Sequence, residues 1–134
     1  MNEIITGLAG VVAAATPVVV AVIGETFSER SGVTNLSANG LIVLTAMIGF
    51  AIAYTSGVVW LAFLGAFLAG ALAGVLISFS SISLKQSQVA VGFILALLFR
   101  DMAYFLGTPF MIVPGPTVKS WPIPLLSQIP LVGQ

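Results

Sequence analysis

The sequence predicts an all-α, polytopic membrane protein with about four transmembrane helices, and its charge content is the main reason. Only 6% of the 134 residues are charged, whereas 59% are hydrophobic. Charged residues make up about a quarter of an ordinary soluble domain, so this composition cannot cover a water-facing surface. In addition, no charged residue occurs between Arg30 and Lys85. This uncharged interval has room for two membrane crossings of about 20 residues each.

Four apolar runs define the expected spans, at residues 4–23, 36–54, 58–79 and 88–107. We expect them to form a single transmembrane domain over residues 1–134. Pro17 lies in the first run, where it predicts a kinked membrane helix. Six of the seven prolines follow Gly107. Residues 108–134 should therefore run extended or in turns, as a proline-rich segment outside the membrane.

The basic residues predict the orientation in the membrane. Arg30 and Lys85 lie two crossings apart, so they share one face, and the positive-inside rule makes that face cytoplasmic. The N-terminus and the proline-rich tail would then be extracytoplasmic. Lys119 would lie on the external side as well.

The residue inventory excludes several classes of function. The chain contains no cysteine and no histidine, which removes thiol nucleophiles, disulfides and the usual metal ligands. It also contains no Walker sequence and no catalytic dyad. We therefore predict no catalytic residue, no metal site and no cofactor. A net charge of zero without a basic face argues against nucleic acid as a partner.

A stripe of small residues marks the third span. Ala62, Ala66, Gly70 and Gly74 recur at every fourth position, so they lie on one face of a helix. Small residues let a second helix approach closely in a membrane. The stripe predicts a helix-packing seam, although glycine and alanine are common in membrane helices in any case.

Arg100 and Asp101 are the costliest residues of the fourth span. Each costs about 2.5–3.5 kcal/mol near the centre of a span on insertion scales. Because adjacent residues point about 100° apart on a helix, we expect the two side chains to be poorly placed to pair with each other. They are either part of a polar pathway or anchors at the outer membrane interface.

Three regions of the sequence resemble a known family. The segment FSERSGVTNL at residues 27–36, followed by Gly40, is similar to the signature after the first helix of bacterial ABC importer permeases for nucleosides and simple sugars. These ribose-type permeases belong with the branched-chain-amino-acid-like transmembrane family. SQVAVG at residues 87–92 and FLG at 105–107 resemble the two ends of the family's next motif, and PIPLL at 122–126 resembles its external segment.

The resemblance implies a function and a set of partners. It implies a permease subunit in the bacterial inner membrane, working with a second permease subunit, cytoplasmic ATPase subunits and an extracytoplasmic substrate-binding protein. It also implies Asn35, Asn39 and Gln88 as residues of the substrate pathway. Asn39 stands where relatives commonly carry glutamate, and Ala96 where they often carry asparagine. Family members are about twice as long, so the chain resembles an N-terminal portion.

Two other functions fit the residues. The first is a self-sufficient four-helix transporter that works as a dimer and is driven by an ion gradient. It needs a membrane carboxylate, for which Asp101 and Glu25 are the candidates. The second is a membrane subunit that does not transport and instead acts as a scaffold for a complex.

Overall fold

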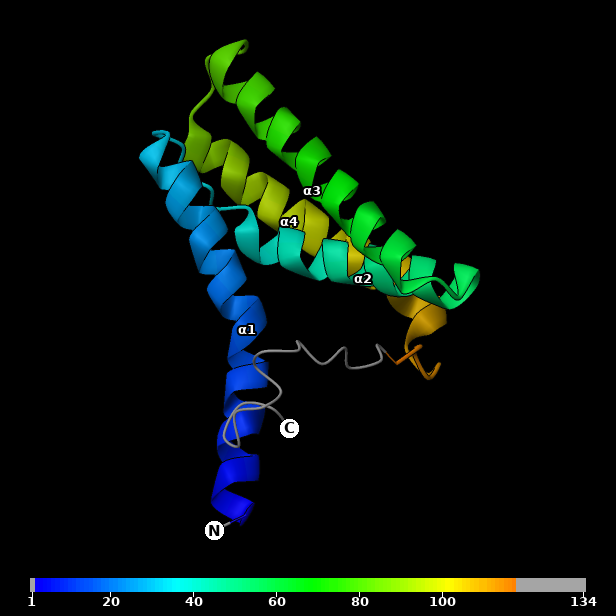
Figure 1. Cartoon of the computed structure of the whole chain (residues 1–134). Helices are drawn as coiled ribbons and strands as arrows, with labels where there is room; N and C mark the ends of the chain where they lie inside the picture. The colour runs from blue at the N-terminus through cyan, green and yellow to red at the C-terminus, as the bar shows by residue number, and fades with distance from the viewer. Residues whose placement is uncertain (1, 118–134) are drawn as a thin grey trace. The chain divides into compact units, whose positions relative to one another are not determined.

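The computed structural model describes residues 2–117, and it confirms the predicted all-helical class. In this range the chain forms four long helices and one short 3₁₀ helix, with no strand (Figure 1). Each of the four α-helices has the length and the apolar composition needed to cross a membrane. The chain divides after Phe27 into two compact units, and each is described by itself below.

Helix α1 runs from Asn2 to Arg30 and continues through Pro17, so the helix extends well beyond the expected span. It ends at a Schellman motif. Gly32 adopts a left-handed conformation with φ +78°, its N–H donates to the carbonyl of Glu29, and the N–H of Val33 donates to the carbonyl of Ser28. Glycine adopts this conformation without a Cβ penalty, which fixes the end of the helix before the second span.

The second unit contains α2 (Ala38–Ser56), α3 (Val59–Ile82) and α4 (Gln88–Gly107). Their bounds differ from the expected spans by at most three residues. Thr55 and Ser56, expected in the turn, form the last turn of α2 instead. The turn itself is Gly57, at φ +68°, which lets α3 return antiparallel to α2. The α2–α3 hairpin packs through small residues: a Cβ built on Gly49 lies 3.7 Å from the Cβ of Ala66.

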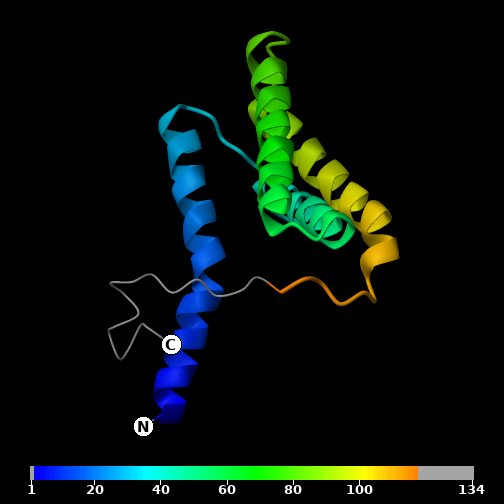
Figure 2. The same ribbon diagram turned by 45° about the vertical axis from the view of Figure 1, so that its right-hand side comes forward.

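Helices α2 and α4 run in the same general direction (Figure 1). Helix α3 follows α2 in the chain and returns to the start of α4 (Figure 2). The parallel course follows from the contacts, because Leu36, just before α2, meets Gly92 near the start of α4, whereas Met47, midway along α2, meets Gly107 at the end of α4. Helix α2 packs against both α3 and α4. The buried cluster contains one residue of α2, one of α3 and two of α4: Leu44, Ala73, Phe99 and Ala103.

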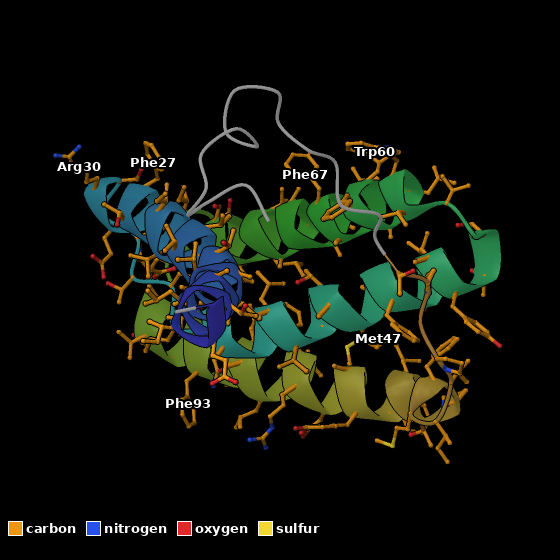
Figure 3. All side chains as sticks on the ribbon, turned by 60° about the horizontal axis from the view of Figure 1, so that its bottom comes forward. Phe27, Arg30, Met47, Trp60, Phe67 and Phe93 are labelled. Atoms are coloured by element: carbon orange, nitrogen blue, oxygen red, sulfur yellow. The ribbon has the colours of Figure 1, made fainter. Side chains whose placement is uncertain are left out.

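Large apolar side chains cover the outer faces of the second unit. Trp60 and Phe67 on α3, and Phe93 on α4, point away from α2 (Figure 3). Trp60 is 72% exposed and Phe67 is 71% exposed. In water such faces would drive aggregation, but in a bilayer they contact lipid tails or neighbouring helices. The exposed apolar surface therefore agrees with a membrane location.

The segment after α4 folds against α2. It begins with the 3₁₀ helix η1 (Thr108–Phe110), and the ring of Phe110 packs edge-on against Phe50 and Tyr54. Gly115 also contacts Phe50, with no room for a side chain between them. From Pro114 to Thr117 the chain has no regular structure, as expected for a proline-rich segment. Lys119 and the PIPLL match at 122–126 lie outside the described residues.

Candidate solute-pathway site

The site is built where α2 and α4 begin, and Asn35 organises its first half. The Asn35 Oδ1 accepts a hydrogen bond from the backbone N–H of Ser37 at 3.2 Å and another from the Ser37 Oγ at 2.6 Å. This is an Asx turn, in which a side chain satisfies the backbone two residues later. Ser37 is completely buried and its hydroxyl is satisfied by Asn35. The pair thus fixes the backbone that leads into α2.

Gln88 connects this turn to α4. Its Oε1 accepts a hydrogen bond at 3.2 Å from the backbone N–H of Thr34, which precedes Asn35 in the chain. Next to it, the Ser87 Oγ caps α4 by accepting from the N–H of Ala90. The loops that enter α2 and α4 therefore lie at the same end of the unit, although more than 50 residues separate them in the sequence.

The three predicted pathway residues are not equivalent in the structure. Asn35 and Gln88 are half-buried and belong to one connected turn, whereas Asn39 is exposed and lies outside these hydrogen bonds. Both carboxamide oxygens accept hydrogen bonds from the chain itself. Among residues 2–117, no hydrogen bond uses the NH₂ group of Asn35 or Gln88. Each carboxamide NH₂ offers two N–H donors, whereas one lone pair of the Gln88 oxygen is the free acceptor capacity of the two residues. Their free hydrogen-bonding capacity is therefore mainly donor capacity.

Glycines bring the two helix starts into backbone contact. A Cβ built on Gly40 collides with the carbonyl oxygen of Ala96 and lies 2.8 Å from the carbonyl carbon of that residue. A Cβ built on Gly92 lies 3.2 Å from the Cβ of Leu36. Sequence reasoning missed this crossing, although both glycines stand inside the motifs. Ala96 is the residue whose backbone meets Gly40.

The predicted small-residue stripe divides into two parts. Ala62 is buried, and the Ala62 carbonyl and Ala66 Cβ are the nearest atoms to Gly49 of α2. Gly70 and Gly74 differ, because a Cβ built on either residue meets nothing within 4 Å. In that half of α3 the buried residues are Ala73 and Ile77. Within the described chain, the stripe thus packs on α2 only through its first two members.

Arg100 and Asp101 do interact, and the expectation that they would not pair is wrong. The Arg100 Nε donates to the Asp101 Oδ1 at 3.4 Å. Although the two residues diverge around the helix axis, the long arginine side chain reaches across this angle. Their side chains are 51% and 70% exposed, so the pair lies on the outside of α4.

An apolar groove of about 460 Å³ lies elsewhere in the unit, between α2 and α3. Its walls are almost entirely aliphatic and aromatic, and Thr45 is the polar residue among them. The Thr45 hydroxyl donates to the carbonyl of Leu41 in its own helix. The groove shares no residue with the Asn35–Gln88 site. Among the described residues, no group of three acidic, cysteine or histidine side chains could hold a metal ion.

Comparison with known protein families gives one match, to the branched-chain amino acid transport system/permease component family, over residues 7–133. No curated protein and no solved structure matches the chain. The family match covers nearly the whole sequence, including all four helices and both glycines of the α2–α4 crossing. It agrees with the membrane-spanning architecture found in the described residues. The chain belongs to the family of permease components of branched-chain amino acid transport systems.

Proposed function

We propose that the chain is a permease subunit of an ATP-driven importer for nucleosides or simple sugars in a bacterial inner membrane. The observation that carries the solute class is the polar site at the start of α2 and α4. Its free hydrogen-bonding groups are the neutral NH₂ donors of Asn35 and Gln88. Sugar hydroxyls and nucleobase carbonyls accept such bonds. A zwitterionic amino acid, by contrast, needs partners for two charges, and a neutral carboxamide supplies none.

The site forms the cytoplasmic mouth of the pathway in this proposal. Arg30 and Lys85 belong to the ends of the two loops that the Thr34–Gln88 hydrogen bond joins. Under the positive-inside rule this end of the unit faces the cytoplasm, and the N-terminus faces outward. Asn39 lies one helical turn beyond Asn35 and is exposed, so it is the next polar group that a passing solute would meet.

The partners follow from the same proposal. The chain would pair with a second permease subunit, and ATP hydrolysis would come from separate cytoplasmic subunits. An extracytoplasmic binding protein would deliver the solute. The ion-coupled alternative requires a carboxylate that faces the interior of the bundle. Asp101 lies instead on an exposed face of α4, paired with Arg100, so this candidate carboxylate gives the alternative no support.

Co-purification tests the assignment. The protein, tagged and expressed from its native gene in its own host, is extracted in mild detergent and purified. We expect a nucleotide-binding ATPase subunit in stoichiometric amount, identified by mass spectrometry and by ATP hydrolysis of the purified complex. A tagged membrane protein of unrelated function from the same host is the control. Recovery of the chain without an ATPase subunit, under conditions that keep other importers intact, would contradict the proposal.

A further inference from the structure

We infer that α2 and α4 move as one rigid body during transport, so that the change of access occurs outside this helix pair. The inference rests on the proposed transport function. Three features of the described residues carry it: the backbone contact of Gly40 with Ala96, the contact of Gly92 with Leu36, and the contact of Gly107 with Met47. The three contacts occur in the same order along both segments, from just before α2 to its middle and from the start of α4 to its end.

The register of the pair is unique. Packed helices change register most readily by a whole turn, about 5.4 Å. A shift of one turn would place either Leu36, which precedes α2, or Leu44 of α2 where Gly40 now meets the carbonyl of Ala96. Each leucine would bring four side-chain carbons into a space that has no room even for a Cβ. After the same shift, a residue with a side chain would lie opposite Leu36, in the position that Gly92 of α4 occupies now.

The loops at one end add a second constraint. The Thr34–Gln88 hydrogen bond joins the entrance of α2 to the entrance of α4. The Asn35–Ser37 turn then continues directly into α2. A tilt that opened this end would break the Thr34 bond and expose the buried Ser37. At the end of α4, a Cβ built on Gly107 lies 3.3 Å from the Cγ of Met47, midway along α2. Separation would therefore lose contacts at both ends of α4.

Disulfide locks at both ends test the inference in a chain that has no cysteine of its own. The first variant is L36C/G92C, whose two Cβ positions are 3.2 Å apart, slightly below the usual range of about 3.5–4.5 Å for a disulfide. The second is M47C/G107C at the end of α4, where a Cβ built on Gly107 lies 3.3 Å from the Cγ of Met47. The control is G49C/A66C in the α2–α3 hairpin, with Cβ positions 3.7 Å apart, which verifies that the oxidation conditions form disulfides in the membrane.

Each variant is purified with its partner subunits, reconstituted in liposomes and assayed for ATP-dependent solute uptake before and after oxidation with copper phenanthroline. We expect both α2–α4 locks to form nearly completely, in the resting complex and in the vanadate-trapped complex alike. Oxidised and reduced samples should show the same uptake within about twofold. If either lock reduces uptake tenfold or more and dithiothreitol restores it, the pair must open and the inference is wrong.

The design separates this inference from the proposed function. If the unmodified complex shows no ATP-dependent uptake of any nucleoside or sugar, the proposed function fails. If it transports and a lock abolishes transport reversibly, only the rigid-pair inference fails. If L36C/G92C does not assemble with its partners, M47C/G107C decides the question alone. Its substitutions lie at the far end of the pair, away from the Gly40–Ala96 contact.

Discussion

Replacing Gly40 by alanine is expected to disrupt the packing of α2 on α4 and to abolish transport. The added Cβ collides with the carbonyl oxygen of Ala96 and lies 2.9 Å from its Cα. These are backbone atoms, so no side-chain rotation relieves the overlap, and the helices must separate. Overpacking of this kind typically costs about 1–3 kcal/mol, occasionally more. The measurement is thermal unfolding of the purified protein, followed by the loss of its helical circular dichroism.

The chain offers a matched control on α3. Gly74→Ala also places a methyl group on a glycine inside a membrane helix, but a Cβ built there meets nothing within 4 Å. The higher helix propensity of alanine favours the substituted helix by about 0.5–1 kcal/mol. We expect Gly74→Ala to unfold at the wild-type temperature or above it. Equal unfolding temperatures for Gly40→Ala and the wild type would show that the close backbone contact is absent in the membrane.

The second large effect is expected at Gln88. Substitutions there distinguish the role of the carboxamide oxygen, which accepts from the Thr34 N–H, from the role of the NH₂ group, which is free to donate. Gln88→Glu keeps an oxygen that accepts from the Thr34 N–H, yet it removes the NH₂ donor. We expect this variant to keep its unfolding temperature and to lose at least tenfold in solute uptake. A hydrogen bond to a polar solute is worth about 0.5–1.5 kcal/mol net. The unfavourable approach of a solute oxygen to a carboxylate adds to this loss.

Gln88→Met is the companion variant, because methionine has a similar length and neither a donor nor a strong acceptor. It should lose uptake and also lower the unfolding temperature, since the Thr34 N–H loses its partner. Asn39→Ala is the site control outside the hydrogen-bonded turn, where only uptake should change. The idea that Gln88 donates to the solute is wrong if Gln88→Glu transports at the wild-type rate.

Much of the fold could be predicted from the sequence. An uncharged interval between Arg30 and Lys85 leaves few alternatives to two membrane crossings, and the bounds of α4 agree with the expected span of 88–107. The length of α1 was less predictable. The polar residues after Gly24 suggested that the span ends at residue 23, whereas the backbone remains helical until Gly32 terminates it. Polarity marks where a span can end, and the helix itself can continue into water.

The site was predictable only in part. The motif at residues 27–36 pointed to Asn35, and the motif at 87–92 pointed to Gln88, but nothing local to either motif indicated that they meet. Their contact depends on the parallel packing of α2 and α4, which the backbone contact at Gly40 makes possible. The pairing of Arg100 with Asp101 was missed for a different reason. Neighbouring residues point about 100° apart on a helix, but the arginine side chain is long enough to reach across this angle.

The most direct test of the central claim is ATP-dependent uptake by the complex purified through this chain and reconstituted in liposomes. Radiolabelled nucleosides, ribose and leucine are compared at equal concentrations, with the cognate extracytoplasmic binding protein present. We expect uptake of a nucleoside or a simple sugar that requires ATP, together with leucine uptake at the background level. Leucine uptake that depends on ATP, with no nucleoside or sugar transported, would contradict the proposed solute class and the role of the Asn35 and Gln88 donors.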